Sequence, residues 1–176
     1  AGAAGNAETY SPVDQIAGGA GTDTLYVETD ANLSFATVTG VENLQVSANT
    51  NAVTMTLAND AAYKELHSLN STSNVTFDNI KNGDVNGAII ATANGTTVTY
   101  DYLGTALTGA TDNLDVMLSA ADGDLDITGV TAANALETLT LNSVSDGELD
   151  DIDLTNANTT KLVITGAGAT NVRGIT

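Results

Sequence analysis

The sequence contains no cysteine and no tryptophan in its 176 residues, and it has a single proline. The absence of cysteine excludes disulfides, zinc–thiolate sites and thiol chemistry. Aromatic residues make up only 4% of the chain. A hydrophobic core must therefore be built mainly from Leu, Val, Ile and Ala, and small or β-branched side chains of this kind pack well on narrow, repeated strands.

Basic residues are also scarce. Lys64, Lys81, Lys161 and Arg173 stand against 22 acidic residues, which gives a formal net charge of −18. Binding to nucleic acid or to an anionic membrane surface needs clustered Lys and Arg, so we expect neither partner. A charge of this size opposes compaction by self-repulsion. Bound multivalent cations would relieve the repulsion, and plain solvation of a negative surface is the alternative interpretation.

Long apolar runs are missing as well. No run approaches the ~20 residues of a membrane-spanning helix, so we expect no insertion into a membrane. Residues 1–15, AGAAGNAETYSPVDQ, have neither a basic region nor an apolar stretch, and they do not have the pattern of a signal peptide. The strand pattern runs up to the last residues, VRGIT, and we expect a fragment of a longer exported protein.

The chain does have many short segments of alternating apolar and polar residues, separated by Gly, Asn, Asp and Ser. Val53, Met55 and Leu57 alternate with threonines, as is typical of half-buried strands. The expected strands are 24–29, 42–47, 52–58, 74–80, 96–102, 113–119, 124–129, 136–142, 151–156 and 161–166. This pattern predicts an all-β fold.

Internal similarity narrows the fold class. Residues 19–58 and 109–156 share an order of Gly-Ala, Thr-Asp, strand, acidic turn, strand and then ENLQV or ETLTL. Such repetition predicts a β-solenoid resembling a parallel β-helix, and a β-sandwich is the alternative. We expect residues 1–17 to form an extension or linker and 18–176 to form the repetitive domain. Coils of roughly 20 residues would give about eight coils and a rod near ~40 Å long.

Two segments are expected to depart from regular coiling. Residues 59–70, NDAAYKELHSLN, contain good helix formers and apolar residues near helical spacing, which predicts a short helical insertion. Asn94-Gly95 lies between two apolar runs, which predicts a hairpin turn within residues 91–102.

One stretch points to a metal. GGAGTDTLY, residues 18–26, fits the pattern G-G-x-G-x-D-x-U-x and resembles the calcium-binding nonapeptide of RTX proteins. Glycines such as Gly19 and Gly21 allow a tight turn in which carbonyls converge, and Asp23 adds a charged oxygen. The second copy keeps Asp112 but loses most of the glycines. One loop supplies too few oxygens for calcium, which takes 6–8 of them.

Two further acidic clusters are candidate calcium ligands: Asp122, Asp124 and Asp126 in one, and Asp150, Asp151 and Asp153 in the other. Alternate residues of a strand share a face, so Asp124 and Asp126 should lie side by side. Exposed turn aspartates without an ion are the alternative for each cluster.

The arrangement GTDTLYV…VTGVENLQV is also similar to the repetitive body of RTX-related bacterial surface-layer proteins and other large surface proteins exported by type I secretion. That resemblance implies calcium-dependent folding and two-dimensional assembly on the outer membrane, at the bacterial cell surface. Exposed ends of a solenoid tend to pair with neighbours, so we expect copies to associate end to end as well as laterally. The runner-up is an adhesin or ligand-binding module, with cell-surface polysaccharide as a partner.

Catalysis has little support in the sequence. His67 is the only histidine, and no Gly-x-Ser-x-Gly elbow or phosphate-binding loop accompanies it. A carbohydrate-active β-helix is the weakest alternative, because aromatic platforms for sugars are sparse and Arg173 is the only arginine. We therefore expect a structural protein and not an enzyme.

Overall fold

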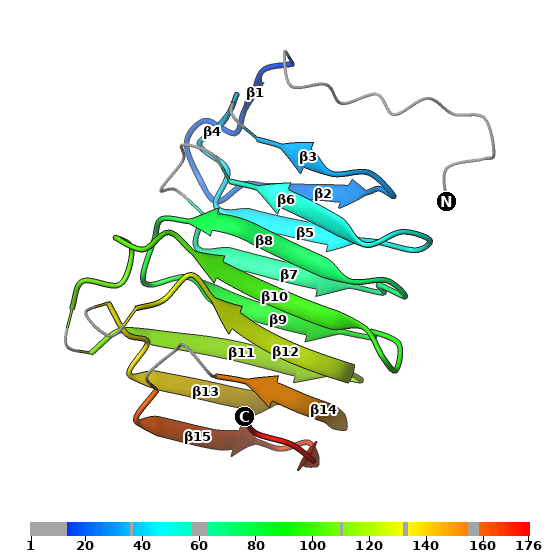
Figure 1. The fold of residues 1–176 in the computed structure, drawn as a ribbon. Helices are drawn as coiled ribbons and strands as arrows, with labels where there is room; N and C mark the ends of the chain where they lie inside the picture. The colour runs from blue at the N-terminus through cyan, green and yellow to red at the C-terminus, as the bar shows by residue number, and fades with distance from the viewer. Residues whose placement is uncertain (1–13, 36, 58–62, 110, 132–133, 155–158) are drawn as a thin grey trace.

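The chain forms a β-solenoid of about six turns. The computed structural model describes residues 14–35, 37–57, 63–109, 111–131, 134–154 and 159–176. Successive strands alternate between two facing parallel sheets, and they stack from the N-terminal end to the C-terminal end in seven levels among the described residues (Figure 1). The expectation of an all-β solenoid is confirmed, and a sandwich of antiparallel sheets is excluded because every paired strand in the described residues runs parallel to its neighbour.

The two large sheets have seven strands each. The first sheet consists of β2 (Thr24–Glu28), β5 (Asn43–Ser47), β7 (Glu65–Leu69), β9 (Asn86–Ile90), β11 (Asn113–Ser119), β13 (Thr138–Ser143) and β15 (Lys161–Gly166). The second sheet consists of β3 (Leu33–Ser34), β6 (Val53–Thr56), β8 (Val75–Ile80), β10 (Thr97–Tyr102), β12 (Asp122–Thr128), β14 (Gly147–Asp153) and β16 (Thr170–Val172). A small third sheet pairs β1 (Ile16–Ala17) with β4 (Val38–Thr39) at the first turn.

The turns differ in length. Register partners on adjacent strands lie 19 residues apart at the start, between Thr24 and Asn43, and 29 residues apart in the middle, between Gly87 and Val116. Seven stacked levels at strand spacing span about 30 Å from first strand to last, less than the length expected from eight short coils.

Alternation of residues explains which side of each strand is buried. In β13, Leu139 and Leu141 are completely buried, whereas Thr138 and Thr140 lie on the outer face. The same pattern repeats on both sheets, so the core is one continuous column of aliphatic side chains between them. Parallel in-register stacking places like residues above one another, which is why a sequence with few large side chains can form a closed core.

Two local predictions are wrong. Residues 59–62 of the expected helix lie outside the described residues, but Glu65–Leu69 is strand β7, paired in parallel with β5 and β9. Leu66 and Ser68 face the core, so the alternating pattern of the segment prevailed over its helix propensity. The Asn94-Gly95 turn exists, with Gly95 at φ 76°, but it connects β9 and β10 across the two sheets and does not close a hairpin.

Candidate functional site

The glycine-rich turn lies before β2, at the N-terminal end of the solenoid. Gly19 and Gly21 have φ values of 94° and 127°, a region that other residues rarely adopt. Gly18 packs so closely against the carbonyl of Gly40 in the next turn that a side chain there would clash. The glycines are therefore explained by backbone geometry at this turn, with or without an ion.

Asp23 and Asp112 occupy matching corners in the two sequence copies. The backbone N–H of Asp23 donates to Oε2 of Glu42 at 2.9 Å, and the N–H of Asp112 donates to Oε2 of Glu137 at 2.9 Å. Oδ2 of Asp112 also accepts from the N–H of Gly109. The glutamates in ENLQV and ETLTL thus tie successive turns together, a role that the sequence analysis missed although both residues were part of the repeat.

Those two aspartates cannot share an ion. Asp23 precedes β2 and Asp112 precedes β11, four levels further along the first sheet, a separation of about 19 Å along the stack. Oδ2 of Asp23 is buried and has no hydrogen-bond partner among the described residues. A buried carboxylate oxygen without a hydrogen-bond partner is better explained by a turn that binds a cation than by a turn that binds none.

The remaining predicted ligands do come together. We call the outer side of β10, β12 and β14 the acidic face, and its eight carboxylates are Asp101, Asp122, Asp124, Asp126, Glu148, Asp150, Asp151 and Asp153. Asp124 and Asp126 share this face, on either side of the inward Leu125.

Strand register pairs these carboxylates across β12 and β14. Asp122 lies opposite Glu148, Asp124 opposite Asp151, and Asp126 opposite Asp153. A register shift between Gly123 and Asp124 places Asp150 in the ladder as an extra residue. Like charges directly opposite each other on adjacent strands destabilise a sheet, so this face carries an electrostatic cost.

Few groups on the chain reduce that cost. Arg173 forms ion pairs with Glu148 and Asp150, and the Nδ2 of Asn94 donates to Asp122 and Asp150 at 3.1 Å each. At the far end of the ladder, desolvation raises the pKa of Asp126 and the charges of Asp153 and Asp101 raise it further, while hydrogen bonds from Thr99 and Ile127 act in the opposite direction. Oδ1 of Asp126 and Oδ1 of Asp151 are buried and have no hydrogen-bond partner in the part of the chain that the structure describes.

Replacing Asp126 by asparagine should stabilise the cation-free protein at neutral pH. The raised pKa means that the folded state binds more protons than the unfolded chain between pH 3.8 and the folded pKa, so the contribution of Asp126 to stability falls as pH rises through that window. Removing one charge of an opposed pair is worth up to about 1 kcal/mol, or about 2–4 °C in melting temperature. Thermal melts in chelator at pH 7 and pH 4 measure this.

The control for that melt is Asp115→Asn, on the outer side of β11 and away from the acidic face. Asp126→Asn should raise the melting temperature at pH 7 and raise it less at pH 4, because the raised pKa leaves a larger share of the wild-type carboxyl protonated at the lower pH. An equal gain at both pH values, or the same gain from the control, would show that charge repulsion at Asp126 is not the cause.

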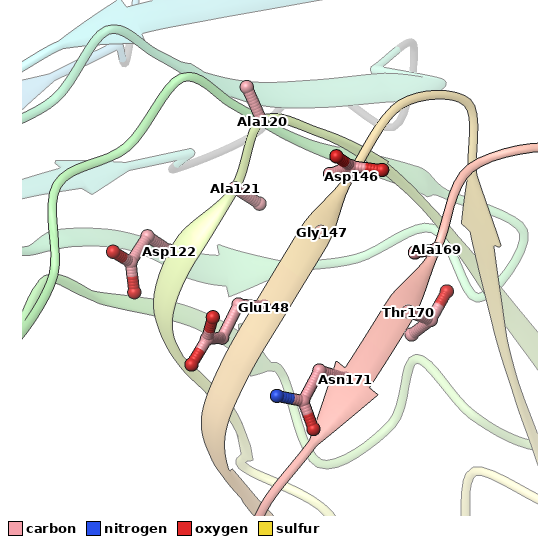
Figure 2. A pocket seen from close by; sticks show the side chains of 9 residues that line it. All are labelled: Ala120, Ala121, Asp122, Asp146, Gly147, Glu148, Ala169, Thr170 and Asn171. Carbon is pink, nitrogen blue, oxygen red and sulfur yellow. The ribbon is translucent and has the colours of Figure 1, made fainter.

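A shallow pocket of about 420 Å³ adjoins the acidic face, at the bend that leads into β12, β14 and β16. Its lining residues are Ala120, Ala121, Asp122, Asp146, Gly147, Glu148, Ala169, Thr170 and Asn171. Figure 2 shows the carboxylates of Asp122 and Glu148 on adjacent strands and that of Asp146 at the start of β14. The pocket combines three carboxylates with small side chains, so it suits a cation or a hydroxyl-rich ligand better than an anion.

Within the described ranges, no group of three Asp, Glu or His side chains is close enough together to hold a metal ion alone. Two buried carboxylate oxygens of the acidic face, on Asp126 and Asp151, have no hydrogen-bond partner among the described residues, and a calcium ion held there would have to complete its shell with backbone carbonyls, water or a second molecule. The part of the chain that the structure describes also contains no helix long and apolar enough to cross a membrane.

His67 lies on the outer side of β7, between Gln45 and Ala88 on the neighbouring strands. Burial lowers its pKa, and the nearby Glu65 carboxylate, 3.4 Å from Nε2, acts in the opposite direction.

Comparison of the sequence with protein-family models and with curated proteins, and of the fold with solved structures, finds no match.

Proposed function

We propose that this chain is a structural segment of a secreted bacterial surface layer, a calcium-stabilised solenoid that assembles with copies of itself. The observation that carries the proposal is the ladder of opposed carboxylates on the acidic face. The stacked turns of the solenoid that bears this face would form a stiff rod. A protein under no need for cations gains nothing from placing Asp124 against Asp151 and Asp126 against Asp153.

Calcium would act by reversing the sign of these contacts. An ion between opposed carboxylates of β12 and β14 turns repulsion into attraction across two turns of the solenoid. Extracellular calcium sites bind with a Kd of roughly 0.1–1 mM. At ~1 mM calcium and a Kd of ~0.1 mM, each site adds about 1.4 kcal/mol to the free energy of unfolding. A few such sites would favour folding outside the cell over folding in a low-calcium cytoplasm.

The decisive experiment is a melt of wild type and Asp126→Asn with and without calcium. In chelator the variant should be the more stable of the two. In ~1 mM Ca²⁺ we expect the order to reverse, because the wild type gains about 3–6 °C per site and the variant has lost a ligand. Asp115→Asn should follow the wild type in both buffers. A wild-type melting temperature that does not respond to calcium would refute the calcium part of the proposal.

The assembly part needs a separate readout. Electron microscopy of the purified protein in calcium should show extended ordered arrays, and chelator should disperse them. Persistent single particles at high concentration, in calcium, would contradict it.

A ligand-binding module of a surface protein is the second candidate, and the pocket in Figure 2 is the observation that favours it. Its carboxylates and small residues could hold the hydroxyls of a cell-surface polysaccharide. Glycan binding that is lost in Glu148→Gln, by a protein that stays monomeric in calcium, would favour this function over the first.

A further inference from the structure

The middle of the chain contains three asparagine–glycine pairs: Asn82-Gly83, Asn86-Gly87 and Asn94-Gly95. Because glycine has no side chain, its backbone nitrogen can approach the side-chain amide carbon of the asparagine before it and close a five-membered imide. The closure requires the backbone at the pair to rearrange. The fold therefore decides which of the three pairs can react.

Two of the pairs are held in place. Nδ2 of Asn82 donates to the carbonyl of Tyr63 at 3.0 Å, and its Oδ1 accepts from the N–H of Asp84 at 3.1 Å. Gly87 is buried within β9, which pairs with β7 on one side and with β11 on the other. Closing an imide at either pair would disrupt these contacts, so both pairs react only after local opening of the solenoid.

The third pair lies in the exposed turn between β9 and β10. The N–H of Thr96 donates to the carbonyl of Ala93 at 3.2 Å, so Asn94 and Gly95 are the two central residues of a β-turn. The N–H of Gly95 has no hydrogen-bond acceptor among the described residues. Apart from its chain neighbours, no described atom lies within 4 Å of the position that a Cβ on Gly95 would take. The reacting nitrogen is unbonded and has space around it.

The side chain of Asn94 joins three turns of the solenoid. Its Nδ2 donates to Oδ1 of Asp122 on β12 and to Oδ2 of Asp150 on β14, at 3.1 Å each. Arg173 pairs with the other oxygen of Asp150 and with Glu148. The amide is thus a neutral donor between two carboxylates. A carboxylate in its place would exchange two hydrogen bonds for two contacts between like charges.

We propose that Asn94 is a deamidation site, and that the reaction makes its contact with Asp122 and Asp150 dependent on a bound cation. The nitrogen of Gly95 attacks Cγ of Asn94, the new C–N bond closes the imide, and the Cγ–Nδ2 bond breaks. Nδ2 leaves as ammonia and takes the proton of the attacking nitrogen. Water then opens the imide at either carbonyl and gives aspartate or isoaspartate. One water is consumed, one ammonia is released, and no atom changes oxidation state.

The product adds one negative charge to a chain whose formal charge is already −18. The new carboxylate repels Asp122 and Asp150, and a cation held between the turns reverses that repulsion. This consequence rests on the proposed function, because it makes the need for calcium grow as the protein ages. The reaction at Asn94 is independent of that function.

Peptide mapping by mass spectrometry tests the site. Folded protein is incubated in mildly alkaline buffer with chelator, beside a sample unfolded in guanidinium chloride. In the unfolded sample the three pairs should react at similar rates. In the folded protein Asn94 should react at least about tenfold faster than Asn82 and Asn86, since only those two require local opening. A smaller ratio in the folded protein, or no reaction at Asn94 where the unfolded chain reacts, would overturn the assignment.

Thermal melts of Asn94→Asp test the consequence. Asn94→Ala is the matched control, because it loses the same two hydrogen bonds and adds no charge. In chelator Asn94→Asp should melt about 2–4 °C below Asn94→Ala, and ~1 mM Ca²⁺ should close or reverse that gap. Equal melting temperatures in chelator, or a gap that calcium leaves unchanged, would refute the cation dependence. A calcium response in Asn94→Asp but not in the wild type would support this inference and refute the calcium part of the proposed function.

Discussion

Replacing Tyr100 by alanine should cost about 3–5 kcal/mol of stability, the largest effect of any single change considered for this chain. Tyr100 is completely buried in the central strand β10, where its ring stacks on Phe77 with centroids 5.5 Å apart. Its hydroxyl donates to the carbonyl of Leu66 at 3.0 Å, across the core from the second sheet to the first. Alanine removes the ring, the stacking and this cross-sheet hydrogen bond together.

The measurement is urea denaturation followed by circular dichroism. Because each turn of a solenoid contacts only its neighbours, a weak middle level should also reduce cooperativity, and we expect a broader transition or two separate ones. Tyr100→Phe separates the contributions, since it keeps the ring and loses only the hydrogen bond, worth about 1 kcal/mol. A wild-type midpoint for Tyr100→Ala would mean that the centre of the stack is not closed by this residue.

The solenoid itself could be predicted because its signal is distributed. Alternation in segments such as 138–142, together with repetition of the whole pattern, indicates parallel stacking whatever any single residue prefers. Local signals were weaker. Leu66 and Leu69 have spacing that suits a helix as well as a strand, and Asn94-Gly95 suits a turn between sheets as well as a hairpin. In both places pairing with neighbouring turns decided the structure, and no segment read alone contains that information.

The candidate site divides in the same way. That Asp124 and Asp126 share a face follows from strand periodicity, and it could be stated in advance. That they face Asp151 and Asp153 depends on register between turns of unequal length, with a register shift between Gly123 and Asp124, and no repeat length predicts it. Glu42 and Glu137 recur at the same place in the two sequence copies. Their role as acceptors for the backbone N–H groups of Asp23 and Asp112 could be recognised only from the structure of the corners.

Gly87 is the residue at which the repeat pattern and the structure disagree most clearly. Its register partners in the preceding turns are Leu66, Leu44 and Leu25, so the pattern favours a large aliphatic side chain there. Instead, a Cβ on Gly87 would lie 2.6 Å from Cζ of Tyr100. The glycine of the first sheet makes room for the tyrosine of the second, and the two positions are complementary in size.

Gly87→Ala should therefore destabilise the protein by about 1–3 kcal/mol, although alanine has the better intrinsic conformational entropy. Gly104→Ala is the matched control, because a Cβ there meets only the carbonyl of Gly129 at 3.8 Å, and it should be neutral or slightly stabilising. Urea midpoints of the two variants give the comparison.

A double-mutant cycle then isolates the pair. Once Tyr100 has been replaced by alanine, the added methyl group at position 87 has space, so Gly87→Ala in that background should cost nothing or recover part of the loss. The coupling energy should be at least about 1 kcal/mol, within the range of contacting residues. Strictly additive effects would mean that the first sheet yields around the new methyl group, and that the packing of the two sheets against each other at this level is looser than the buried tyrosine implies.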